Sequence, residues 1–112
     1  DVSFGSTPDD RPEDCAEIGK GPMIGFAPIL DRTLSRRLTE TAQKHGIPYQ
    51  TEIIGSRTGT DADFIAVSRG GVRTGLLSIP LRFMHTAGEI AALCDLEQTA
   101  RLLAKTIEEG LS

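Results

Sequence analysis

The residues best suited to chemistry lie between Leu76 and Ile90, a segment that reads LLSIPLRFMHTAGEI and holds one of the chain's two histidines. The first half of the segment is an apolar run typical of a buried strand. His85 follows this run on a predicted loop, and Glu89 lies four residues later. Imidazole is the commonest metal ligand in proteins and needs a hydrogen-bond acceptor to fix its tautomer. The residues alone leave two interpretations open for His85: a metal or catalytic role, or a hydrogen bond to the backbone.

The elements that must position His85 alternate between strand and helix. Apolar or alternating segments predict strands at residues 2–4, 23–30, 49–54 and 72–80, with Pro80 ending the last one. Cap and stop signals predict helices that begin at Asp31 or Thr33, at Thr60 and at Asp95, and that end near Gly46, Gly70 and Gly110. This order predicts an α/β fold with a mostly parallel sheet, in which ligands gather at the carboxyl ends of strands.

Two helices carry more specific expectations. In the last helix Asp95 is the predicted N-cap, and the spacing predicts one buried apolar stripe, formed by Leu96, Ala100, Leu103 and Ile107. At the start of the short middle helix, Thr60 and Asp63 match the pattern of a capping box. The second histidine, His45, falls in the last turn of the first helix, where a cation favours the helix dipole. That structural role is preferred to a ligand role.

Composition narrows the class of protein. A length of 112 residues allows a single domain, residues 1–112, with a long polar loop at about residues 5–22. A net charge of -4 argues against nucleic-acid binding, and no apolar stretch is long enough to span a membrane. No signal peptide is visible, and two distant cysteines, Cys15 and Cys94, are typical of a reducing compartment. We therefore expect a cytoplasmic location.

Several compact motifs are absent from the sequence. GKGPMIG lacks the spacing of a phosphate-binding loop, and neither G-x-S-x-G nor H-E-x-x-H occurs. Nucleoside triphosphate hydrolysis, serine hydrolase chemistry and the compact zinc-protease helix therefore have no support from the sequence. His85 remains the principal candidate.

A longer pattern is more specific than any of these motifs. TGTDADFIAVSRGGVRTGLLSIPLRFMHTAGEI, followed by DLEQTARLL, resembles the carboxy-terminal third of the tetrahedral aminopeptidase family. These are the glutamyl and deblocking aminopeptidases, which are metallopeptidases with two co-catalytic metal ions. The matching motifs are G-T-D-A at Gly59–Ala62 and R-[FY]-[MI]-H at Arg82–His85, and IGKGPMI and KHGIPYQ also match. Some family members are labelled endoglucanases, but no spaced carboxylate pair here supports glycosidase chemistry.

The resemblance implies a fold and a set of site residues. The fold is part of a three-layer α/β/α catalytic domain, and the cofactors are two divalent ions, usually zinc or cobalt. His85 corresponds to the ligand of one ion, and Asp1, which heads a segment similar to the family's D-V-T strand, is the candidate ligand of the other. Gly59, Thr60 and Asp61 match a segment expected near the active site and are predicted to bind substrate. The capping box is a sufficient alternative explanation for Thr60.

The resemblance also implies what this segment does not contain. In the family an amino-terminal histidine, a bridging aspartate and a glutamate beside the general-base glutamate all lie earlier in the chain, so we expect no general base here. We predict that the 112-residue chain alone has no aminopeptidase activity. Arg57 stands where many relatives carry another residue.

The expected partners are peptide substrates, the remainder of a parent polypeptide, and further copies, because the family forms dimers that assemble to a dodecamer. An uncovered sheet edge and apolar face predict that the chain alone dimerises. Two other functions stay open: a structural or self-associating module without chemistry, and a related metal-dependent amidohydrolase.

Overall fold

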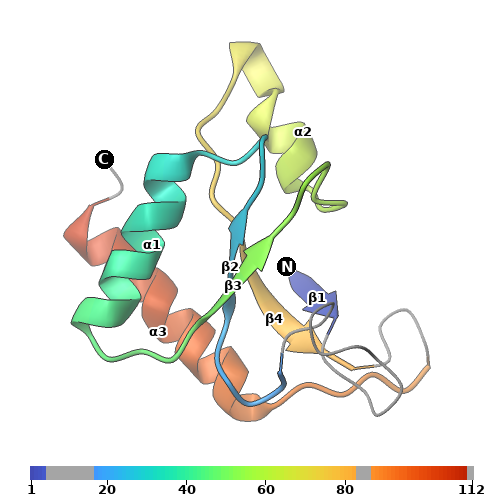
Figure 1. Ribbon diagram of the computed structural model, residues 1–112, viewed down its shortest axis with the longest axis vertical. Coiled ribbons are helices and arrows are strands. Elements are labelled where there is room, and N and C mark those ends of the chain that lie inside the picture. The colour runs from blue at the N-terminus through green and yellow to red at the C-terminus, as the bar shows by residue number, and fades with distance from the viewer. Residues whose placement is uncertain (5–16, 83–86, 111–112) are drawn as a thin grey trace.

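The computed structural model describes residues 1–4, 17–82 and 87–110 (Figure 1). Its elements are β1 (Val2–Phe4), β2 (Met23–Phe26), α1 (Arg32–Lys44), β3 (Gln50–Ile53), α2 (Ala62–Ala66), the 3-10 helix η2 (Ser68–Gly70), β4 (Leu77–Leu81) and α3 (Leu93–Glu109). This order of strands and helices is the one that the sequence predicts. His85, Cys15 and most of the predicted loop at residues 5–22 lie outside the described residues.

The described strands form one sheet in the order β1-β4-β2-β3. β1 and β4 are parallel, as are β2 and β3, and these two pairs join through a short antiparallel contact between β2 and β4. The predicted α/β class with a mostly parallel sheet is therefore confirmed. Because β1 and β4 run in the same direction, Asp1 lies beside the beginning of β4 and Arg82 lies just past its end.

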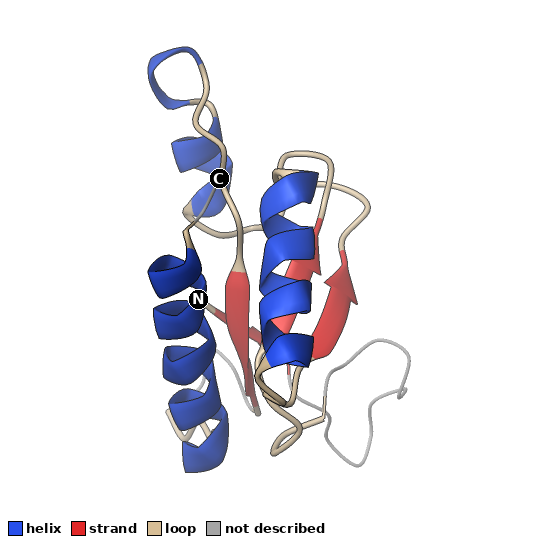
Figure 2. Cartoon of the chain, turned by 90° about the vertical axis from the view of Figure 1, so that its left-hand side faces the viewer, coloured by secondary structure: helices blue, strands red, loops and turns tan. Residues whose placement is uncertain are grey.

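The long helices lie next to each other on one side of the sheet, as both views show (Figures 1 and 2). α1 packs on β2 and α3 packs on β4. The main core fills the space between this helical layer and the sheet, and its buried members are Ile24, Leu38, Ala42, Ile47 and Leu102. Aliphatic side chains removed from water in this layer supply most of the stabilisation.

The beginning and end of α1 follow from local chemistry. Asp31 is the N-cap, and its carboxylate accepts a hydrogen bond from the amide of Leu34 at 2.9 Å. Of the two predicted caps, Asp31 is correct and Thr33 is wrong. After the helix, Gly46 takes φ +64°, the left-handed conformation that stops a helix and that glycine adopts without strain.

The predictions for α3 are wrong at two points. The helix begins at Leu93 with Ala92 as N-cap, so Asp95 lies within the first turn, where it is fully buried. Leu102 and Thr106 form the buried stripe, whereas Leu96, Leu103 and Ile107 are 45%, 49% and 58% exposed. Periodicity finds an apolar face but does not say which face meets the neighbours. Here α1 and the loop before β2 contact the other side of α3.

β4 departs from prediction because it contains Pro80 instead of ending there. Pro80 pairs with Ser3 of β1 inside the strand. The contact between β4 and β2 ends at Ser78, so β2 requires no amide from position 80. On the side of β1, the ladder uses the amide of Ile79, which donates to the carbonyl of Asp1 at 2.9 Å. Proline is therefore tolerated.

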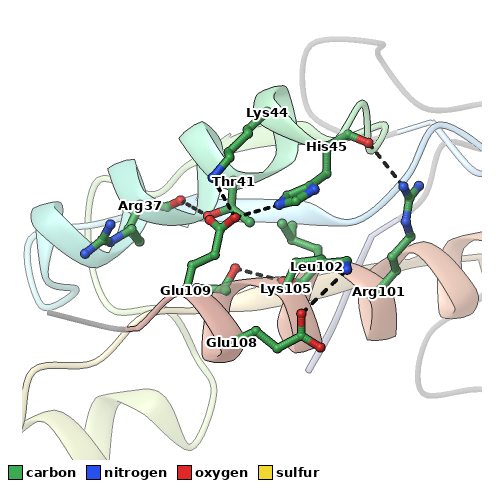
Figure 3. A network of polar contacts seen from close by, with 10 residues as sticks. Arg37, Thr41, Lys44, His45, Arg101, Leu102, Lys105, Glu108 and Glu109 are labelled. Carbon is green, nitrogen blue, oxygen red and sulfur yellow. Dashed lines mark hydrogen bonds and ion pairs between the residues drawn. The ribbon is translucent and has the colours of Figure 1, made fainter.

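The carboxyl ends of α1 and α3 are joined by a polar cluster (Figure 3). Glu109 accepts from Lys44 at 2.9 Å and contacts His45 Nε2 at 2.7 Å, while Arg101 donates to the carbonyl of His45 at 3.2 Å. The Lys44 ammonium, followed by His45, lowers the pKa of the Glu109 carboxyl. His45 is the C-cap of α1, one residue past the predicted last turn, and its ring contacts Glu109; the predicted interaction with the helix dipole stays a prediction.

Two further observations concern the class of protein. Within the described ranges, no helix combines the length and the apolar character needed to cross a membrane. The thiol of Cys94 is free and exposed.

Candidate functional site

An open hollow at the beginning of β1 and β4 brings together residues that the sequence analysis selected separately. Its volume is about 450 Å³, and it is lined by Asp1, Thr60, Asp61, Ala62, Ile65, Thr74, Gly75 and Leu76. Asp1 and the pair Thr60–Asp61 are far apart in the sequence, yet both line this space, which we call the Asp1 hollow. Gly59 precedes Thr60 in the same loop. The hollow is thus a site-sized space with carboxylates and a hydroxyl at its wall.

Asp1 is held by the first rungs of the ladder between β1 and β4. Its amino group donates to the carbonyl of Leu77 at 2.9 Å, and its own carbonyl accepts from Ile79 at 2.9 Å. One carboxylate oxygen, Oδ1, accepts from the amide of Val2 at 2.8 Å. The exposed carboxylate retains lone pairs for a further partner, as a metal ligand or an ammonium-binding group requires.

Asp63 organises the loop that carries Thr60 and Asp61. Its Oδ1 accepts from the amide of Thr58 at 3.0 Å and from the hydroxyl of Thr58 at 2.7 Å, while Oδ2 accepts from the amide of Gly59 at 2.9 Å. These donors, the Thr58 hydroxyl above all, lower the pKa of the Asp63 carboxyl. Gly59 takes φ +74°, which glycine permits. The hydrogen bonds to Asp63 therefore fix the conformation of the loop that carries Thr60 and Asp61.

The capping box predicted at Thr60 and Asp63 does not form. The hydroxyl of Thr60 accepts from the amide of Ala62 at 3.2 Å instead of from the amide of Asp63. Asp63, however, reaches back to Thr58 and Gly59 instead of to Thr60. Asp61 is the N-cap residue by position, but its side chain makes no capping bond and is exposed. The side chain of Asp61 therefore does not cap α2.

Asp95, predicted only as an N-cap, is the most completely buried carboxylate of the described chain. Asp95 accepts from the amides of Gly19 and Gly21, both at 2.8 Å, and its residue is fully buried. Gln50 fixes the same loop, because its side-chain amide donates to the carbonyls of Glu17 and Gly21. We call this arrangement the Asp95 clamp. Asp95 lies in the first turn of α3, but nothing in the sequence shows that its side chain is buried.

His85 lies outside the described residues, so the structure does not place it relative to Asp1. The residues that bracket it are described. Arg82 and Ile90 form an antiparallel bridge with both backbone hydrogen bonds, at 2.7 and 3.0 Å, which closes the base of the intervening segment. The prediction that His85 and Asp1 bind metal ions is untested and stays a prediction.

The described residues do not by themselves make a metal centre. Among them, no group of three or more His, Cys, Asp or Glu side chains is placed to hold a metal ion. Asp1 fits as a single ligand, since it is an exposed carboxylate with an uncommitted lone pair at the edge of a hollow. The rest of a ligand set must come from outside the described residues.

Comparison with known proteins decides the family. The family model for M42 glutamyl aminopeptidases matches residues 1–102. The chain belongs to the M42 glutamyl aminopeptidase family.

Relatives within the M42 family support this assignment in sequence and in structure. The lysyl aminopeptidase of Pyrococcus furiosus is 38% identical over 109 residues, which are 97% of this chain and 32% of the relative. An aminopeptidase structure from Desulfurococcus kamchatkensis superposes with a TM-score of 0.89 at 33% identity, covering 98% of this chain and 33% of that one. The structure of PhTET1-12s, a dodecamer, has a TM-score of 0.70 at 28% identity, covering 94% and 31%. The chain therefore spans about a third of the length of these M42 relatives.

The name endoglucanase also occurs among the structural neighbours, as the resemblance predicted. One such neighbour, from Thermotoga maritima, is 24% identical with a TM-score of 0.65, so it shows a shared fold only. Another neighbour, whose name gives both peptidase and endoglucanase, is 46% identical with a TM-score of 0.74. The M42 assignment rests on the family match and on the lysyl aminopeptidase of Pyrococcus furiosus.

Proposed function

We propose that this chain is the carboxy-terminal part of the catalytic domain of a metal-dependent aminopeptidase that removes N-terminal residues from peptides. The observation that carries the proposal is the M42 match over residues 1–102. The common hollow of Asp1, Thr60 and Asp61 adds support, because the family resemblance points to the same three residues independently of the fold.

We propose Asp1 and His85 as ligands of two different metal ions, zinc or cobalt, in the complete enzyme. When bound, such a pair would supply an activated water and polarise the substrate carbonyl. Arg82 lies three residues beyond Ile79, which pairs with Val2, so it is about 13 Å along β4 from the level of Asp1. The proposal requires that the chain beyond Arg82 bring His85 back towards the hollow.

The remaining site residues have binding roles in this proposal. The exposed carboxylate of Asp61 would attract the positively charged N-terminus of a peptide, and the hydroxyl and backbone of Thr60 would help to orient it. Asp63 supports both residues by holding the preceding amides of Thr58 and Gly59. Gly59 contributes its left-handed backbone, which sets the direction in which the loop enters the hollow.

The experiment is a zinc titration followed by calorimetry on a polypeptide that includes the upstream ligands, with His85→Ala and Asp1→Asn as variants. We expect two high-affinity sites in the parent protein and the loss of one site in each variant. His45→Ala is the matched control, because His45 is a structural residue bound to Glu109. Unchanged zinc binding in both ligand variants would show that the ligand assignment is wrong.

The 112-residue chain alone should hydrolyse no aminoacyl anilide, since a single carboxylate and one histidine cannot hold two ions close together. Activity in the purified chain, abolished by a chelator and free of contaminating peptidase, would contradict this statement. In the complete protein, release of acetylated amino acids but not of N-terminal residues would favour a related amidohydrolase.

The structural alternative has one observation in its favour, because several apolar side chains of α3 are exposed. A polypeptide that binds no zinc but self-associates would support that alternative. We also propose homo-oligomeric assembly of the complete protein, since one relative is a dodecamer, and a cytoplasmic location, which fractionation of source cells would check.

A further inference from the structure

A second hollow, which the proposed function does not use, opens where β2 and β3 end and α1 begins (Figure 1). Its volume is about 480 Å³. We call it the Arg32 pocket, and its wall includes Phe26, Leu30, Arg32, Ser35, Ile53 and Ile54. No residue lines both this pocket and the Asp1 hollow, so the two are separate spaces.

The Arg32 pocket offers a cation without a counter-ion. Arg32 is the one charged residue that lines it, and no carboxylate does so within the described part of the chain. The Arg32 side chain is exposed and has no hydrogen bond or ion pair to another described residue. The adjacent carboxylate of Asp31 is already engaged, because it accepts from the amide of Leu34 at 2.9 Å and from Arg73 at 3.2 Å. The guanidinium of Arg32 is therefore available to an anion.

The rest of the wall limits what that anion can be. Phe26, Leu30, Ile53 and Ile54 present apolar side chains, and Ile53 is 83% exposed in the absence of an occupant. An inorganic anion would leave these side chains in water, and a neutral apolar molecule would leave the guanidinium unpaired. A guanidinium binds a carboxylate through two parallel hydrogen bonds. The matching chemistry is an apolar side chain with a carboxylate beside it, which is the chemistry of the last residue of a peptide.

The Arg32 pocket and the Asp1 hollow lie on two sides of one buried cluster. Leu30 lines the pocket, Ala62 and Leu76 line the hollow, and these three side chains pack together. Residues 54–61 run from the end of β3 to the start of α2 and thus connect the two spaces (Figure 1). In the strand order β1-β4-β2-β3, the outer strands are about 14 Å apart, a distance that an extended peptide covers in about four residues.

We propose that the Arg32 pocket binds the apolar carboxyl-terminal residue of a short peptide whose amino terminus lies in the Asp1 hollow; this inference rests on the proposed function. Arg32 pairs with the terminal carboxylate, and the wall around Phe26 and Ile53 receives the side chain. Peptides of about five residues reach both spaces at once. Longer peptides extend past the pocket and gain nothing from Arg32.

The first test measures the binding of peptides to the full-length polypeptide by ligand-observed NMR titration. The probes are N-acetyl-Gly-Gly-Gly-Gly-Leu with a free carboxylate and the same peptide with a terminal amide. Arg32→Gln removes the charge from the pocket. Arg36→Gln is the matched control, because Arg36 is also exposed on α1 but does not line the pocket.

We expect the carboxylate peptide to bind about tenfold more tightly than the amide in the wild type and in Arg36→Gln, and equally to the amide in Arg32→Gln. Equal binding of the two peptides to the wild type overturns the proposal, and so does the same loss in both variants. Ile53→Ser is a second, independent variant, which should reduce the preference for a peptide that ends in leucine over one that ends in glycine. An unchanged preference would show that the side chain does not enter the pocket.

The second test follows release of the first residue from Leu-Gly-Gly-Gly-Leu, as the acid and as the amide. The acid should have a KM about tenfold lower in the wild type, a difference that Arg32→Gln abolishes and that a nine-residue peptide does not show. Selective binding without this difference in KM would identify the ligand as a free apolar carboxylate instead of the end of a substrate, and would overturn the proposal. A polypeptide that hydrolyses no peptide contradicts the proposed function, whereas the binding comparison still decides whether Arg32 recognises a terminal carboxylate.

Discussion

Two carboxylates perform the same local task in two different environments. Asp95 and Asp63 each accept hydrogen bonds from the amides of a glycine-containing loop. Asp95 is fully buried and joins α3 to the loop before β2, whereas Asp63 lies in the first turn of α2 and holds the loop that leads to the open Asp1 hollow. The fold depends on the hydrogen bonds of Asp95, because a buried amide that loses its partner cannot form a hydrogen bond to water instead. The second shapes a surface that is accessible to ligands.

The largest effect should come from Asp95→Ala, which leaves the buried amide of Gly21 without an acceptor and removes the acceptor of the more exposed Gly19 amide. We expect the free energy of unfolding to fall by about 3–5 kcal/mol. Asp95→Asn keeps one acceptor oxygen and should lose roughly half as much. Urea unfolding followed by circular dichroism measures both changes. A loss below that of an average surface substitution would mean that the Asp95 clamp does not stabilise the fold.

The two loops also differ in how much space their glycines have. Gly21 takes φ +96°, and a Cβ atom there would lie 2.2 Å from the carbonyl oxygen of Pro48. Gly21→Ala should therefore destabilise by about 3 kcal/mol, from strain and overlap together. Gly59 takes φ +74° with open space around it, so Gly59→Ala should cost only about 1–2 kcal/mol. Equal losses in thermal unfolding would contradict the comparison.

The difference in stability between the wild type and Asp63→Asn should depend on pH. The pKa of Asp63 is lowered in the folded chain, chiefly by the hydroxyl of Thr58. A carboxyl with a lowered pKa stabilises the fold above its unfolded pKa, and this contribution is lost as the pH falls through the folded value. The melting temperatures of wild type and variant should thus differ at neutral pH and converge in acid. A constant difference down to strong acid would argue against the bonds to Thr58.

The smallest effect should follow Glu109→Gln at the ends of α1 and α3. Glu109 interacts with Lys44, whose side chain is 66% exposed, so solvent screens the ion pair. We expect a slight fall in melting temperature that shrinks further at high salt. A large, salt-independent loss would indicate that the cluster in Figure 3 contributes more than its exposure suggests.

Sequence reasoning was most successful where a local rule acts alone. The N-cap at Asp31 and the helix stop at Gly46 follow from the chemistry of a few adjacent residues. Sequence reasoning failed where the structure depends on a neighbouring element. Pro80 is accommodated within β4 because the pairing with β2 ends at Ser78. Of the candidate site, Asp1, Thr60 and Asp61 were selected through the family resemblance, and their common hollow appears only in the folded chain.

The α/β order of elements and the M42 family were within reach of the sequence, because periodicity, caps and long motifs are written in neighbouring residues. Which side of α3 faces the core was not. The buried side of α3 is the side that packs on α1. It is also the side from which Asp95 accepts hydrogen bonds from Gly19 and Gly21 in the loop before β2. Tertiary packing decides such matters because burial is a property of the assembled surfaces and not of any one segment.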